Sequence, residues 1–180
     1  YRVMRTGGYS YNANPQPQAY LSNTNAGPCF FCRKSDFLDI RFEEERWMDA
    51  MPYAIGDDQV MFYKMWLCGM KQMTLFGSGI THLDAGTTMR DENKERRLVY
   101  ADFRFKKIFW HRLIYMPDKN WMSRQYSKLC IAYAFGASMF LSFAKLRFDI
   151  LKLKWGAIKD GINFLASDEY KKLPRIINKR

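Results

Sequence analysis

The longest periodic patterns of hydrophobic and polar residues lie in the middle and the C-terminal part of the chain. Residues 58–67 are apolar at most positions and are followed by Gly69, which predicts a largely buried helix that ends near the glycine. Residues 95–116 interleave basic and aromatic side chains up to Pro117, which predicts a long basic helix. Over residues 145–163 polar positions recur at steps of three and four, which predicts an amphipathic helix with a basic face.

The N-terminal part of the chain predicts shorter elements. Residues 1–28 are rich in Gly, Asn, Pro, Ser and Tyr, and this composition predicts a long loop lying over a site or an interface. The apolar run Cys29–Cys32 predicts a strand, and Ser35 predicts the start of a helix that reaches about Ile40. The other predicted elements are a helix or turn over 43–53 that closes over a pocket, and strands over 70–76 and 79–83.

A long uncharged run lies between the basic helix and the amphipathic helix. Residues 129–144 contain no formal charge and are bounded by Lys128 and Lys145. This run is shorter than the roughly 20 residues that a helix needs to cross a bilayer. We therefore expect it to be buried or to lie at a membrane interface.

Charge divides the chain into two different halves. The formal net charge is +11; residues 1–89 carry eight basic and nine acidic residues, and residues 90–180 carry twenty-one and nine, so the halves have net charges of −1 and +12. Such asymmetry indicates an anionic partner for the second half, either nucleic acid or a membrane surface. The bases and aromatic residues of 96–112 would suit nucleic acid, but they lead into apolar amphipathic helices, which favours an anionic membrane surface and no nucleic acid.

Composition also indicates the class of protein and its compartment. A hydrophobic content of 48% argues against disorder and predicts one compact domain with an appendage. Four scattered cysteines do not form a secreted disulfide framework, which favours a reducing cytosolic compartment. The Cys29–Cys32 spacing also fits zinc, but no second such pair accompanies it. The chain begins at Tyr1 without a signal peptide, and we expect it to be a piece of a longer protein.

The candidate chemistry lies at one helix start and one strand end. Asp57 and Asp58 open the predicted helix 58–67, where a rigidly held carboxylate can act as a general base. The alternative is that the pair only caps the helix and compensates its dipole, although one aspartate suffices for a cap. His82 follows at the end of a predicted strand, where it can bind a metal or phosphate or serve a structural role. His111 lies in the basic helix, and we interpret it as a surface or interface residue.

Four segments carry a resemblance to a known family. They occur in order and at suitable spacing: Asn25 to Lys34, Gly56 to Lys64, Gly69 to Lys71 and His82 to Gly86. Over roughly residues 20 to 115 the chain resembles the C-terminal half of a family-2 glycosyltransferase with the GT-A fold. The resemblance implies an α/β fold, a partial GT-A domain with a Rossmann-like mixed sheet, followed by C-terminal amphipathic helices.

The resemblance also implies roles for particular residues. Asp58 would be the catalytic base that deprotonates the acceptor hydroxyl, with Asp57 as its acidic neighbour in the catalytic pair. Asn25, Ala26 and Gly27 would line the cleft for the donor sugar and the acceptor. His82 would bind the divalent metal, Mg or Mn, or the donor diphosphate.

The same resemblance implies a division of the chain and its partners. Residues 1–89 would be the acceptor-side half of the glycosyltransferase domain, 90–118 a basic aromatic helix that closes it, and 119–180 membrane-associated helices. Such enzymes carry an Asp-x-Asp metal motif in an N-terminal nucleotide-binding half, and this chain contains no Asp-x-Asp. We therefore expect the isolated 180 residues to be inactive.

The function implied by the resemblance is transfer of a sugar in cell-surface glycan or polysaccharide synthesis, with inversion at the anomeric carbon. Its partners would be a nucleotide-sugar donor, a glycan or lipid-linked acceptor, and an anionic membrane on whose cytoplasmic face the protein would lie. The alternative function is a noncatalytic basic module that docks a membrane surface or a polyanion through residues 96–180.

Overall fold

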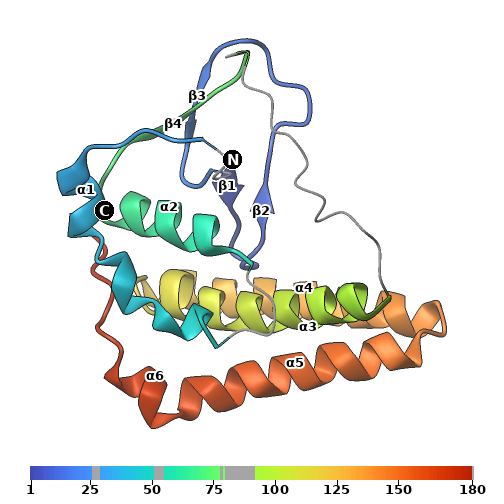
Figure 1. The fold of residues 1–180 in the computed structure, drawn as a ribbon. Helices are drawn as coiled ribbons and strands as arrows, with labels where there is room; N and C mark the ends of the chain where they lie inside the picture. Colours follow the sequence, from blue (N-terminus) through green and yellow to red (C-terminus); the bar gives the residue numbers. More distant parts are fainter. Residues whose placement is uncertain (26–28, 51–54, 78, 80–91, 180) are drawn as a thin grey trace.

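The chain is mixed α/β, as expected from the sequence, and most of its regular structure is helical. The computed structural model describes residues 1–25, 29–50, 55–77, 79 and 92–179. Within them, β-structure consists of two separate two-stranded antiparallel sheets, which lie above a layer of helices (Figure 1). The Rossmann-like mixed sheet expected from the sequence is not seen in these residues.

Both sheets draw on the segment predicted to be a loop. Strand β1 (Arg2–Val3) pairs with β2 (Tyr9–Ser10), and β3 (Ala19–Ser22) pairs with β4 (Gln72–Leu75) in the register Ser22 opposite Gln72. The prediction of β4 is confirmed, whereas the prediction of a loop throughout 1–28 is wrong for these strands. Pairing with β4, about fifty residues away in sequence, supplies hydrogen-bond partners that local composition does not reveal.

The Cys29–Cys32 segment is not a strand, contrary to the prediction. Its residues are exposed, and the side chain of Phe31 is 94% exposed. No strand pairs with the segment in the described chain, so its apolar character alone is insufficient for β-structure. Helix α1 (Lys34–Asp39) follows as predicted, but Arg33 occupies the cap position and makes no side-chain capping bond.

Helix α2 (Asp57–Leu67) confirms the predicted buried helix. Gly69, with φ of +92°, follows its end, as predicted. Asp57 does not cap the helix, contrary to the prediction. Gly56 occupies the cap position, and Asp57 is the first residue of the helix itself.

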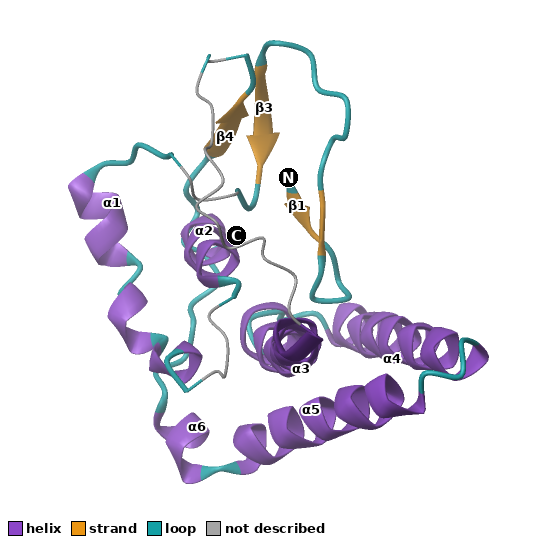
Figure 2. Cartoon of the chain, turned by 45° about the vertical axis from the view of Figure 1, so that its right-hand side comes forward, coloured by secondary structure: helices purple, strands orange, loops and turns teal. Residues whose placement is uncertain are grey.

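The predicted basic helix is the central element of the fold. Helix α3 (Glu92–Phe109) continues into a π-helical segment, Trp110–Tyr115, before Pro117. Figure 2 looks along α3, with α2, α4 (Trp121–Ala144) and α5 (Phe148–Ala166) around it. The short helix α6 (Asp168–Lys172) follows α5. One apolar cluster joins these elements through Trp47, Val60, Phe109, Ile131 and Phe164.

The aromatic side chains of α3 explain the interleaved pattern of the basic helix. Phe103, Phe105, Phe109 and Trp110 are all buried, while the basic residues between them lie nearer the surface. Lys107 lies over the ring of Trp110 at 5.0 Å. These rings pack in the core and cannot stack on bases, so the stacking argument for a nucleic-acid partner does not apply to them.

A buried cluster of charges ties three elements together. Glu45 lies between two short 3-10 turns, Phe42–Glu44 and Arg46–Met48, and is only 1% exposed. Its carboxylate accepts hydrogen bonds from Arg112 Nε at 2.5 Å and Nη2 at 2.8 Å, and from the Trp47 indole at 2.7 Å. Lys64 of α2 lies 2.7 Å from the same carboxylate.

The charges of this cluster compensate one another. Burial raises the pKa of Glu45, but the hydrogen bonds and positive charges of Arg112 and Lys64 outweigh burial and hold the pKa below its usual value. A carboxylate with a lowered pKa stabilises the fold above its unfolded pKa, and this contribution is lost as pH falls through the folded value. The predicted turn over 43–53 therefore carries a structural ion pair that the sequence did not reveal.

We predict that Glu45→Gln lowers the free energy of unfolding by about 3–5 kcal/mol, because Arg112 and Lys64 are then left buried without their anion. Urea unfolding followed by circular dichroism measures this change. Glu44→Gln is the matched control, since Glu44 lies 3.9 Å from Lys64 and its other ion pair is with exposed Arg41. A loss of more than about 1 kcal/mol in Glu44→Gln would contradict the structural role given to Glu45. An unchanged free energy of unfolding in Glu45→Gln would contradict it as well.

His111 is half-buried in the π-helical segment, where its Nδ1 lies 2.7 Å from the hydroxyl of Tyr170 in α6. Burial, together with the charges of Lys107 and Arg124, lowers the pKa of His111 from 6.5 to about 4. The folded protein therefore holds this imidazole neutral over a pH range in which the unfolded chain protonates it. The contact joins α6 to the end of the central helix.

We predict that stability falls as pH drops from about 6.5 towards about 4, because only the unfolded chain binds a proton at His111 in that range. His111→Gln should flatten this part of the profile, which urea titrations at about pH 7 and about pH 5 can measure. Glu45 contributes little to the change above about pH 5, since its pKa lies below 4.5. An unchanged slope in the variant would rule out His111 as the source.

Candidate functional site

A cavity of about 770 Å³ lies at the N-terminal end of α2. Figure 1 shows α2 above α3, with the β1–β2 hairpin at one end of α2. All three of these elements contribute to the walls. Among the described residues the lining consists of Tyr1, Tyr9, Tyr11, Thr24, Asn25, Ile55, Gly56, Asp58, Gln59, Leu98, Val99, Asp102 and Phe105.

The cavity brings together two residues singled out from the sequence. Asp58 lines it from the first turn of α2, and Asn25 lines it from the segment that follows β3. Thirty-three positions separate them in the chain. Asp57, by contrast, is exposed and is not among the described lining residues. The structure therefore places Asp58, and not Asp57, among the described residues that line the cavity.

The other sequence candidates cannot be placed. Ala26, Gly27 and His82 lie outside the described residues, as does most of the predicted strand 79–83. Within the described part of the chain, no three His, Cys, Asp or Glu side chains are grouped so that they could hold a metal ion. The divalent metal expected from the sequence therefore stays a prediction.

A polar network holds Asn25 at the cavity wall. Its Oδ1 accepts hydrogen bonds from Ser22 Oγ at 3.2 Å and from Thr74 Oγ1, and its Nδ2 donates to Gln72 Oε1 at 3.5 Å. Gln72 in turn donates to the Phe62 carbonyl of α2 at 2.5 Å. The β3–β4 pair therefore connects Asn25 with the helix that carries Asp58.

The start of α2 is shaped by close packing on α3. Gly56 has φ of +78°, and a Cβ placed on it would lie 2.2–2.6 Å from ring atoms of Phe105. Gln59, one turn further on, donates a hydrogen bond to the Gly7 carbonyl at 3.3 Å. A side chain at position 56 is excluded both by conformation and by space. The glycine lets α2 begin directly against α3, next to the cavity.

Several cavity residues were not predicted from the sequence. Tyr1, Tyr9 and Tyr11 lie near one another, with ring centroids of Tyr1 and Tyr11 6.1 Å apart, and they form an aromatic wall. Their clustering depends on the β1–β2 hairpin. Asp102 adds a second carboxylate, paired with Lys106 at 2.7 Å. One signal could have revealed it, because Asp102 is the sole acidic residue between Arg96 and Pro117.

The cavity combines polar side chains, which can bind a polar ligand, with the aromatic rings of tyrosines. A carboxylate in the first turn of a helix is favoured by the helix dipole and can accept a proton or a hydrogen bond. Tyrosine rings pack against flat apolar faces while their hydroxyls reach polar groups. Thr24 adds a hydroxyl that is buried and has no hydrogen-bond partner in the described structure. A ligand rich in hydroxyl groups matches this set.

Comparisons of the chain with protein-family models, with curated proteins and with solved structures found no match. The assignment of a function therefore depends on the geometry of the cavity and on the residues that line it.

We predict that Gly56→Ala destabilises the fold by about 2 kcal/mol or more, because a methyl group meets Phe105 in a backbone conformation unfavourable for alanine. Gly69→Ala is the matched control: it has φ of +92° but nothing within 4 Å of an added Cβ, so only the backbone cost of about 1–2 kcal/mol applies. Thermal or urea unfolding measures both. Equal losses in the two variants would show that the contact with Phe105 has no role.

Proposed function

We propose that this chain is the acceptor-side part of a GT-A glycosyltransferase of family 2, which transfers a sugar from a nucleotide-sugar donor to an acceptor hydroxyl. The observation that carries the proposal is the cavity in which Asn25 and Asp58 lie together. Both residues belong to segments that resemble the family. Both residues were identified from the sequence, and in the structure both line the same cavity.

In the proposed reaction Asp58 accepts the proton of the acceptor hydroxyl. The acceptor oxygen then bonds to the anomeric carbon of the donor sugar, and the bond from that carbon to the nucleoside diphosphate breaks. The diphosphate leaves with the electron pair of the broken bond, and attack from the opposite face inverts the anomeric centre. This role needs a carboxylate that faces the bound acceptor, and the position of Asp58 in the lining of the cavity supports it.

The remaining cavity residues would bind the sugars. Asn25 offers an amide whose orientation is held by Ser22, Thr74 and Gln72, and a fixed amide can select one pattern of hydroxyl groups. The tyrosine wall would pack against the sugar ring. In the full-length enzyme, His82 would bind a divalent Mg or Mn ion or the donor diphosphate.

The second candidate function is a noncatalytic basic module in which the acidic pair only caps α2. Gly56 occupies the cap position of α2, so neither aspartate is the cap residue of this helix. Stabilisation of the helix dipole by Asp57 and Asp58 remains compatible with either function. Their different positions relative to the cavity provide the test.

We predict that Asp58→Asn in the full-length enzyme lowers turnover by roughly two to four orders of magnitude while donor binding is retained, because the amide cannot accept the hydroxyl proton. Release of nucleoside diphosphate measures turnover, and calorimetry measures donor binding.

The matched control is Asp57→Asn, an identical change at the adjacent exposed residue, which should reduce turnover far less. Normal turnover in Asp58→Asn would refute the base assignment. Equal losses in both variants would show that the helix start, rather than a positioned base, explains the effect.

A further inference from the structure

The outer face of α4 is apolar and exposed along its length. Met122, Leu129, Tyr133 and Phe140 follow one another at intervals of seven, four and seven residues, which places them on one side of the helix. Their exposed fractions are 73%, 69%, 78% and 66%. By length and composition α4 is also the one described helix that could span a bilayer. A stripe of this kind is a contact surface and not a core face.

The exposed apolar surface continues through the turn into α5. Leu146 is 73% exposed and adopts a left-handed conformation, with φ of +54°, which is unfavourable for a leucine. The rings of Phe143 and Phe148 meet across the turn with centroids 5.9 Å apart. Trp155 and Ile162, at further steps of seven from Phe148, extend the surface along α5. Ile158, by contrast, is buried against α3 and α4.

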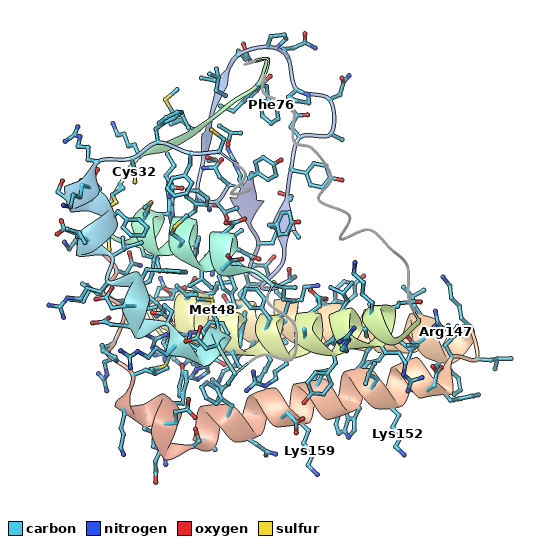
Figure 3. All side chains as sticks on the ribbon, in the orientation of Figure 1. Cys32, Met48, Phe76, Arg147, Lys152 and Lys159 are labelled. Carbon is cyan, nitrogen blue, oxygen red and sulfur yellow. The ribbon has the colours of Figure 1, made fainter. Side chains whose placement is uncertain are left out.

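Basic side chains border this apolar surface. Lys145 and Arg147 flank Leu146, and Lys152 and Lys159 lie on the exposed side of α5. Figure 3 shows Lys152 and Lys159 extending away from the body of the protein, and Arg147 at the turn between α4 and α5. The nearby Asp149 forms an ion pair with Arg96 at 3.1 Å, and Arg147 forms an exposed ion pair with Glu95 at 3.4 Å, whereas no ion pair is found for Lys145, Lys152 or Lys159 among the described residues. The border of the surface is therefore predominantly positive.

The opposite face of α4 is attached to the rest of the protein, through Ile131 in the apolar core and through polar bonds of its serines. Lys154 of α5 donates hydrogen bonds to Ser138 O at 3.0 Å, Ser138 Oγ at 2.8 Å and Ser142 Oγ at 2.9 Å. Arg5 donates to Ser123 Oγ at 2.6 Å and Ser127 Oγ at 2.9 Å. A helix that crossed the bilayer would carry these serines and cations into hydrocarbon or break their bonds. The two faces of α4 thus suit a helix that lies in the interface.

We propose that the α4–α5 hairpin docks on an anionic lipid bilayer and lies in its interface without crossing it. The outward residues of α4, Leu146, Phe148, Trp155 and Ile162 enter the boundary of the acyl chains, and Lys145, Arg147, Lys152 and Lys159 contact the anionic head groups. The charge of the border selects a negatively charged membrane over a neutral one. This docking does not depend on sugar transfer, because the cavity and α5 adjoin different faces of α3.

The test uses the 180-residue chain and co-sedimentation with vesicles of phosphatidylglycerol and phosphatidylcholine, against vesicles of phosphatidylcholine alone. We expect binding to the anionic vesicles, weakened by salt. Leu129→Ser with Phe140→Ser should lower the partition coefficient by roughly tenfold or more. Its matched control is Leu21→Ser with Leu75→Ser, two leucines of the β3–β4 sheet that are 68% and 64% exposed.

A second variant pair tests the charge. Lys152→Gln with Lys159→Gln should lower binding to anionic vesicles by roughly tenfold or more at low salt, because each lysine near the surface contributes about fivefold. Lys34→Gln with Lys71→Gln removes the same charge from exposed positions outside the hairpin and should change binding little.

Four results would overturn the proposal. The first is vesicle binding by either hairpin variant that equals the binding of the wild-type chain. The second is a loss of binding in a control variant that equals the loss in the matching hairpin variant. The third is resistance of vesicle-bound protein to extraction by alkaline carbonate, which would show a spanning helix. A concentration-dependent dimer without vesicle binding would instead assign the apolar surface to a second copy of the chain.

Discussion

The buried carboxylate of Glu45 joins the elements on which the packing of this protein depends. Arg112 holds it from the π-helical end of the central helix, Lys64 from α2 and Trp47 from the adjoining turn. Each partner belongs to a different element, and each would be costly to bury alone. The cluster therefore fixes how α2 lies on α3. Because α2 carries Asp58 at its start, the same contacts determine where that carboxylate faces.

The central helix α3 separates two surfaces with different properties. Leu98, Asp102 and Phe105 face the cavity, whereas Tyr100 and Arg104 contact α5 through Asp160 and Phe164. A ligand in the cavity and a membrane beneath the α4–α5 hairpin would therefore not compete for the same side chains. An enzyme with this arrangement could hold its acceptor site close to a bilayer while keeping the site open to soluble donors.

Helices with strong periodicity could be predicted from the sequence, and the site could be predicted only in part. The helices α2 and α3 were predicted because their patterns extend over many residues. The strand over Cys29–Cys32 was predicted wrongly because a short apolar run forms a strand only when another strand pairs with it. Asp58 and Asn25 were found through their segments, but the contribution of Asp102 depends on how α3 packs.

The sequence by itself determined the long helices, the uneven charge and the acidic pair, because each follows from local composition or spacing. Only the tertiary structure decided that Asp58 and not Asp57 lines the cavity, since their difference comes from the rotation of α2 against α3. It likewise decided which apolar side chains of the C-terminal helices are buried. Both outcomes arise from contacts between residues distant in the chain, and these contacts are invisible to a periodic pattern.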